Sequence, residues 1–247
     1  ARFQRYQHND LEQLSRLLEA SRAHKAQARR LIMADAVFSM DGDAADARAL
    51  AALARRTQSW LMLDDAHGFG VLGNSGAGLC QQQQLSQQDV PVLMATLGKA
   101  VGVSGAFVAG SEALIETLIQ SARSYIFTTA TPPAIAAAVM QSIQLIRQES
   151  WRREKLFELI AYFKQRIAGL ECELMPSDTA IQPLVIGDNH RALQISQQLF
   201  GEGIHVTAIR PPTVPPGTAR LRITLSAAHQ KKDIDQLINA LQKYLTR

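Results

Sequence analysis

The chain has 247 residues, of which 47% are hydrophobic, and this is enough to bury a sizeable core in one large or two small domains. The net charge of +4, without a basic and aromatic stripe, gives no support for nucleic-acid binding, and Cys80 and Cys172 are too few for a disulfide framework or a thiolate metal site. No apolar run could span a membrane and residues 1–5 show no signal-peptide pattern, so we expect a soluble, cytoplasmic protein with no metal and no membrane partner.

The first half of the chain alternates helix and strand patterns, which is typical of a mainly parallel sheet covered by helices. Asn9 is expected to cap the first helix, because Glu12 follows three residues later. Residues 31–38 have the pattern of a buried strand, and Asp43 is expected to cap a helix at 43–57. Further strands are predicted at 60–64, 92–97 and 105–109, and a further helix at 112–123.

The second half begins with a long helical stretch from Pro132 to about residue 170, with a bend expected at 149–153. Beyond it the sequence predicts strands at 180–186, 204–208 and 219–225, with helices at 190–200 and 228–245. We therefore expect an α/β fold in which residues 1–150 belong to a domain with a mainly parallel sheet and residues 151–247 form a small α+β domain.

Two neighbouring strands of the predicted sheet end near side chains that can carry chemistry. One ends at Asp64, with His67 three residues later, and the next ends near Thr96 and Lys99. Strand alternation puts Asp64 and Asp65 on opposite sides, and Asp64 is preferred because it spans one tight turn with His67. A carboxylate, an imidazole and an amine at strand ends are the groups needed to hold pyridoxal phosphate. The alternative is an acid that caps the turn, followed by a solvated histidine.

A glycine pattern overlaps this segment. Residues 68–73 match the G-x-G-x-x-G fingerprint of dinucleotide-binding proteins, but residues 74–78 have the composition of a loop. Because the third glycine should pack within an opening helix, a nicotinamide site is disfavoured.

Hydroxyl and guanidinium groups at other element ends are further candidates. Ser39 follows a predicted strand, and Thr128 and Thr129 precede the helix that begins at Pro132, where free backbone N–H groups favour anions. Arg210 and Thr213 lie on a proline-rich loop of the small domain. A guanidinium pairs with a carboxylate through two hydrogen bonds, so this loop is a plausible carboxylate clamp.

Taken in order along the chain, these motifs resemble the α-oxoamine synthases, a branch of the fold-type I pyridoxal-phosphate enzymes. The resemblance covers nearly the whole chain and is carried by residues 37–43, 63–70, 96–99 with 102–105, 127–133 and 208–226. It implies a homodimer that binds pyridoxal 5'-phosphate in sites formed across the subunit interface.

The resemblance also implies a role for each candidate residue. Lys99 would form the Schiff base with the cofactor, and Asp64 would pair with its pyridine nitrogen. His67 and Ser39 would contact the 3'-oxygen region of the cofactor, and Thr96 would bind its phosphate. Thr128 and Thr129 would reach a phosphate in the partner subunit, and Arg210 and Thr213 would hold substrate groups.

Within this family, residues 209–217 favour the branch that condenses L-alanine with a pimeloyl thioester in biotin biosynthesis. The thioester is carried by coenzyme A or by acyl carrier protein. The alternatives are the branches that use glycine or serine with other acyl thioesters, and a non-catalytic scaffold subunit, which should lack the lysine found at position 99.

The family has an N-terminal portion that should precede Ala1, with a glycine-rich phosphate turn and an aromatic residue that stacks on the cofactor. Nothing before Ser39 resembles that portion. We therefore expect the chain to be a fragment of the enzyme, and to be inactive when isolated.

Overall fold

The computed structural model describes residues 2–25 and 27–245 and divides into two compact units. Residues up to 37, together with 45–148, form the first unit, and residues 38–44 join those from 149 onward in the second. The sequence prediction had placed residues 38–44 in the first domain, so for this segment it was wrong. In the described part of the chain, no helix is both long enough and apolar enough to cross a membrane.

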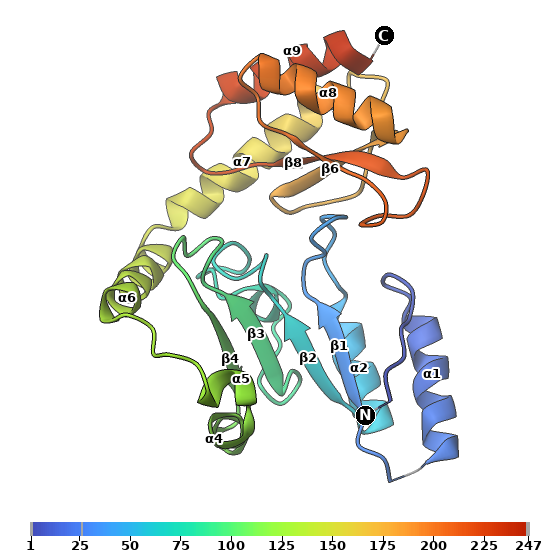
Figure 1. Ribbon diagram of the computed structural model, residues 1–247, viewed down its shortest axis with the longest axis vertical. Helices are drawn as coiled ribbons and strands as arrows, with labels where there is room; N and C mark the ends of the chain where they lie inside the picture. The colour runs from blue at the N-terminus through green and yellow to red at the C-terminus, as the bar shows by residue number, and fades with distance from the viewer. Residues whose placement is uncertain (1, 26, 246–247) are drawn as a thin grey trace. The chain divides into compact units, whose positions relative to one another are not determined.

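The first unit is built on a four-stranded sheet in the order β1-β2-β3-β4 (Figure 1). The strands are β1 (Leu31–Asp35), β2 (Trp60–Asp64), β3 (Val92–Thr96) and β4 (Ala106–Gly110). The first three are parallel and β4 is antiparallel to β3. The carboxyl ends of the parallel strands therefore lie at one edge of the sheet, where Asp35 is the register partner of Asp64. The expected α/β class with a mainly parallel sheet is confirmed.

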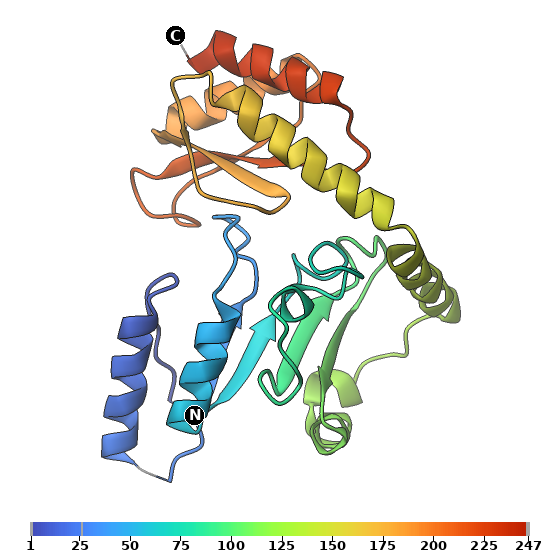
Figure 2. The same cartoon turned by 180° about the vertical axis from the view of Figure 1, so that it is seen from behind.

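Helices cover one face of this sheet more completely than the other. The helices of the first unit are α1 (Leu11–His24), α2 (Ala47–Thr57), α3 (Leu79–Gln82), α4 (Glu112–Ser121), α5 (Arg123–Ile126) and α6 (Pro133–Gln148). Helix α2 packs against β2 and lies in front of β1 in the view of Figure 2. Leu61 and Leu63 of β2 are fully buried, whereas Leu31 and Met33 of β1 remain 51% and 55% exposed. The prediction of a buried strand at 31–38 is thus wrong for one face, and β1 ends at Asp35.

Two helix caps differ from the sequence predictions by one to three residues. Asp10, and not Asn9, caps α1, because its side chain accepts the N–H of Gln13. Asp46, and not Asp43, caps α2 by accepting the N–H of Ala49 at 2.9 Å. A cap needs a side-chain oxygen that reaches the N–H three residues on, and several nearby acids could satisfy that pattern in the sequence.

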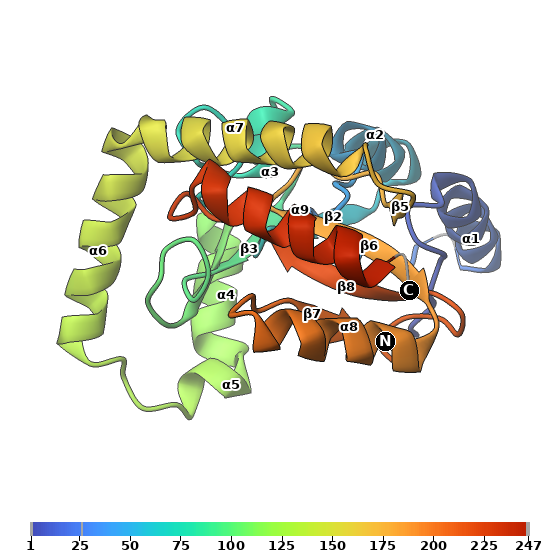
Figure 3. The same cartoon turned by 90° about the horizontal axis from the view of Figure 1, so that it is seen from above.

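The second unit is a small α+β structure with an antiparallel sheet in the order β5-β6-β8-β7. Its elements are α7 (Ser150–Ile167), β5 (Glu173–Leu174), β6 (Ile181–Gly187), α8 (Asn189–Gly201), β7 (Thr207–Ile209), β8 (Ala219–Thr224) and α9 (Lys231–Leu245). Helix α8 packs on β6, β7 and β8, and α9 packs on α7 and α8 (Figure 3). Phe163, Leu184, Leu199, Leu221 and Leu241 are fully buried between these layers.

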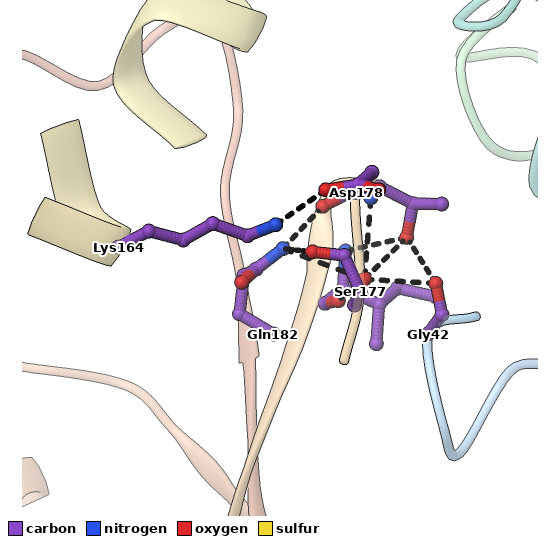
Figure 4. Close-up of polar contacts among 7 residues, drawn as sticks. Gly42, Lys164, Ser177, Asp178 and Gln182 are labelled. Carbon is purple, nitrogen blue, oxygen red and sulfur yellow. Dashed lines mark hydrogen bonds and ion pairs between the residues drawn. The ribbon is translucent and has the colours of Figure 1, made fainter. Parts of the chain in front are cut away.

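Residues 38–44 are tied into the second unit by polar contacts, part of which Figure 4 shows. The Gly42 carbonyl accepts hydrogen bonds from the Ser177 and Thr179 hydroxyls, both at 2.8 Å. Gly42 has a φ of +72°, and a Cβ atom there would lie 2.4 Å from the Ile181 carbonyl, so the turn requires glycine. The Gln182 amide donates to the Thr179 carbonyl at 2.7 Å and completes this buried cluster.

Candidate active site

The turn after β2 carries the first two candidate residues. Asp64 Oδ1 accepts the backbone N–H of Ala66 at 3.0 Å, which closes a tight turn directly before His67. The Asp64 side chain is partly exposed, whereas that of Asp65 is buried. The two acids therefore differ in access to a ligand, in the way that strand alternation predicts.

The loop after β3 carries Lys99. This loop, residues 97–105, closes on itself because the N–H of Leu97 donates to the Gly105 carbonyl at 2.8 Å. The Thr96 hydroxyl at its base donates to the same Gly105 carbonyl at 3.1 Å and accepts the N–H of Gly98 at 3.3 Å. Lys99 is exposed at the tip, so its amine is held near the sheet edge without being buried.

The two loops meet, and this contact joins the candidate residues. Nζ of Lys99 lies 2.7 Å from Nε2 of His67, a hydrogen-bonding distance. The backbones also approach closely, since a Cβ atom on Gly70 would lie 2.6 Å from the Cβ of Ala100. The structure therefore brings the amine and the imidazole together at the end of β3, next to the strand that ends in Asp64.

Asp35 belongs to the same sheet edge, although the sequence reasoning did not select it. Partial burial and the negative charge of Asp64 raise the pKa of Asp35 above its usual range, while the positive charges of Lys99 and His8 lower it. The signal in the sequence was its place at the end of the first parallel strand, beside the end of the second. The cluster therefore holds two carboxylates around one amine.

Ser39 and the two threonines lie on other segments than Asp64, His67 and Lys99. Ser39 lies in the segment held by the second unit, where its carbonyl accepts a hydrogen bond from Nε of Arg222 at 2.6 Å. Thr128 and Thr129 are exposed between α5 and α6.

Arg210 and Thr213 lie on the loop between β7 and β8 of the second unit. Both residues are exposed, and the N–H of Thr213 donates to the Arg210 carbonyl at 3.0 Å. An open pocket of about 620 Å³ is lined by residues 211–216. The loop thus offers a guanidinium and a hydroxyl next to an apolar, proline-rich hollow.

The glycine fingerprint at 68–73 does not open a helix. Residues 69–76 form successive turns, and the next helix, α3, begins only at Leu79. The structural context required for a dinucleotide-binding fingerprint is therefore missing, as the composition of the loop predicts.

Comparison with known proteins places these features in a family. Residues 1–241 match the sequence model of the aminotransferase class I and II family. A curated relative, 8-amino-7-oxononanoate synthase from Saccharophagus degradans, is 55% identical over 245 residues, covering 99% of this chain and 61% of the relative. The chain thus spans about three-fifths of that relative's length.

Two solved structures have the same fold. A serine palmitoyltransferase variant from S. paucimobilis, with a bound PLP–myriocin aldimine, superimposes with a TM-score of 0.91 at 27% identity, covering 97% of this chain and 60% of that one. An 8-amino-7-oxononanoate synthase from Francisella tularensis gives 0.85 at 29% identity, covering 100% and 69%. The likeness that the sequence motifs indicated is confirmed: the chain belongs to the aminotransferase class I and II family.

Proposed function

We propose that this chain carries the catalytic lysine and the substrate loop of a pyridoxal-phosphate-dependent acyltransferase. The proposed reaction condenses L-alanine with a pimeloyl thioester to 8-amino-7-oxononanoate, with release of carbon dioxide and the thiol carrier, as a step of biotin biosynthesis. The observation that carries the proposal is the contact of Lys99 with His67 beside Asp64, in a chain 55% identical to a synthase of that name.

The donor set fits pyridoxal phosphate. When bound, this cofactor supplies an electron sink for negative charge at the α-carbon of an amino acid. The Lys99 amine is the group that would bind its aldehyde carbon, and the Asp64 carboxylate would keep a proton on its pyridine nitrogen. His67 and Ser39 would hold its 3'-oxygen region, and the hydroxyl of Thr96 would bind its phosphate.

Lys99 would also transfer protons. The Lys99 amine, held at the loop tip, would take or return a proton at the α-carbon of alanine. His67, with Nε2 at 2.7 Å from Nζ, limits the directions in which the amine can point. Both side chains are mounted on short loops at the ends of sheet strands, which fixes their separation.

The loop between β7 and β8 is the proposed acyl site. The guanidinium of Arg210 would pair with the free carboxylate of the pimeloyl group, and Thr213 would add a hydrogen bond. The hollow lined by residues 211–216 suits the methylene chain, because its lining is largely apolar. The thioester carrier is coenzyme A or acyl carrier protein.

The functional assembly is proposed to be a homodimer. Thr128 and Thr129 are exposed on the segment between α5 and α6, so their hydroxyls are accessible to a ligand. In the dimer their hydroxyls would reach the cofactor phosphate of the partner subunit.

Condensation of serine with a fatty acyl thioester is the second candidate, favoured by the TM-score of 0.91 to a serine palmitoyltransferase. The test gives L-alanine, L-serine or glycine to the full-length protein loaded with pyridoxal phosphate, each together with pimeloyl-CoA, pimeloyl–acyl carrier protein or palmitoyl-CoA. We expect a change in cofactor absorbance and release of the free thiol with alanine and one of the two pimeloyl thioesters. Turnover with serine and palmitoyl-CoA alone would favour the second candidate, and no turnover with any pair would contradict both.

A further inference from the structure

Asp65 is an acid that the proposed mechanism does not use, although it lies next to Asp64. The residue is only 1% exposed, which is rare for an aspartate without a structural task. Its backbone N–H donates to the Met94 carbonyl of β3 at 2.7 Å, so the residue is fixed to the sheet. Its carboxylate therefore points from a rigid position into the interior of the first unit.

The carboxylate closes the loop that carries His67. We call residues 66–78 the His67 loop. Oδ2 of Asp65 accepts the N–H of Leu79, directly after the loop, at 2.7 Å, and the Asp65 carbonyl accepts the N–H of Phe69 at 2.9 Å. Both ends of the loop are thus bonded to one residue.

Two glycines show how closely the loop surrounds this carboxylate. A Cβ atom on Gly68 would lie 2.1 Å from Oδ1 of Asp65, and one on Gly78 would lie 1.9 Å from Oδ2. Real Cβ atoms do not approach so closely, so side chains are excluded at both ends of the loop. The loop backbone is packed directly on the carboxylate, so a substitution at Asp65 changes the packing at both ends of the loop.

We propose that Asp65 is a positioning residue whose carboxylate keeps the His67 loop closed, so that His67 stays at hydrogen-bonding distance from Lys99. His67 lies between Asp65 and Gly68, both of which the contacts hold in place. A loop that opens would withdraw the imidazole from the amine. The kinetic consequence of this inference rests on the proposed function, whereas the structural consequence does not.

The charges around Asp65 agree with a structural task. Burial raises its pKa to about 7, and the negative charge of Asp64 adds to the rise, while the N–H groups of Leu79 and Gly68 lower it. Cys80 is the titratable group that faces it from α3, and burial followed by the charge of Asp65 and then Asp89 raises the pKa of that thiol to about 11. Asp65 thus shares a low-dielectric region with groups that resist ionisation.

The test compares Asp65→Ala with Asp65→Asn in the full-length protein. Alanine removes both acceptor oxygens and leaves the buried N–H of Leu79 without a partner, whereas asparagine keeps one oxygen for it. Asp89→Ala is the matched control, since Asp89 also accepts a backbone N–H, from Ser86 at 2.9 Å, and also faces Cys80. Hydrogen exchange of the His67 loop is measured without cofactor, and kcat and KM for L-alanine are measured with it.

We expect loop exchange about tenfold faster in Asp65→Ala, near-normal exchange in Asp65→Asn, and no change in the loop of the control. The kcat should fall about tenfold in Asp65→Ala with KM for alanine nearly unchanged, and should recover in Asp65→Asn. Unchanged loop exchange and kcat in Asp65→Ala would overturn the proposal. If that variant does not fold, rapid exchange of the Leu79 amide in the unmutated protein would overturn it instead. An unmutated protein without synthase activity would contradict the proposed function, while the hydrogen-exchange comparison would still test the structural role of Asp65.

Discussion

At the scale of single residues, Lys99 contributes little to packing because it is exposed on a loop that closes through its own backbone hydrogen bonds. We expect Lys99→Ala in the full-length protein to abolish turnover and leave the fold intact, since only the amine that binds the cofactor is removed. Circular dichroism and an assay with alanine and pimeloyl-CoA measure the two effects. Lys25→Ala removes another exposed lysine of the first unit and should change neither. Retained synthase activity in a folded Lys99→Ala protein would refute the assignment.

Asp64 is expected to matter through its charge. Asp64→Asn should still bind pyridoxal phosphate but turn over about 30- to 1000-fold more slowly, because the pyridine nitrogen loses the anion that keeps it protonated. The rate is compared with that of Asp65→Asn, which keeps the buried acceptor for the N–H of Leu79. A harmless Asp64→Asn beside a severely damaging Asp65→Asn would reverse the assignment of the two acids.

The raised pKa of Asp65 makes a prediction about pH. The ordinary value is 3.8 and the folded value is about 7, so between these limits the folded state binds more protons than the unfolded state. The free energy of unfolding should therefore fall as pH rises from about 4 to about 7, by at most about 1.4 kcal/mol per pH unit, and then level off. Urea unfolding of the unmutated protein and of Asp65→Asn at several pH values isolates the contribution of Asp65 to the free energy of unfolding. If the free energy of unfolding of the unmutated protein instead rose with pH relative to that of Asp65→Asn, the hydrogen bonds to the carboxylate would outweigh the cost of its burial.

Much of the residue-level site was accessible from the sequence, because strand alternation and strand ends are local properties. They separate a partly exposed Asp64 from a buried Asp65 and place Lys99 beside the same edge. The 2.7 Å contact of Lys99 with His67 was not accessible, because it depends on how two loops meet. Asp35 was missed because the predicted strand ran on to residue 38, whereas β1 ends at Asp35.

At the scale of elements, strands and long helices were predicted within a few residues, whereas helix starts were not. Asp43 and Asp46 are both acids before an alanine-rich helix, and only the structure shows that Asp46 accepts the N–H of Ala49. We expect Asp46→Ala to lower the free energy of unfolding by about 1 kcal/mol, because that N–H loses its side-chain acceptor. Urea unfolding measures the change. Asp46→Asn keeps a capping oxygen and should restore most of the stability, and equal losses in the two variants would contradict the capping role.

At the scale of the whole molecule, the chain passes between the two units after residues 37, 44 and 148. The sequence predicted only the last of these crossings, near the bend at 149–153. Residues 38–44 read locally as a turn that follows a strand, and nothing in their own pattern shows that Ser177 and Thr179, more than 130 residues later, bind the Gly42 carbonyl. Contacts of such long sequence separation are set by tertiary packing and cannot be read from local periodicity.

The contact of Arg220 with Asp41 tests how firmly this segment belongs to the second unit. The side chain of Arg220 is only 5% exposed, and Nη1 donates to Oδ1 of Asp41 at 2.6 Å. Asp41→Ala would leave a buried guanidinium without its anion, so we expect the free energy of unfolding of the second unit to fall by about 2 kcal/mol. Asp178→Ala is the matched control, because it breaks another ion pair of the same unit. The carboxylate of Asp178 binds Lys164 and is fully exposed (Figure 4).

The two tryptophans of the chain separate the units in this experiment. Trp60 lies on β2 of the first unit and Trp151 on α7 of the second. In a Trp60→Phe background, tryptophan fluorescence during urea unfolding therefore reports on the second unit alone. In that background, Asp41→Ala should move the urea midpoint down by about 1 M, and Asp178→Ala should leave it nearly unchanged, because exposed ion pairs contribute little. A Trp151 transition that does not move in Asp41→Ala would show that residues 38–44 contribute nothing to the second unit. Ser39 would then not be held there, although its carbonyl is bonded to Arg222 of β8.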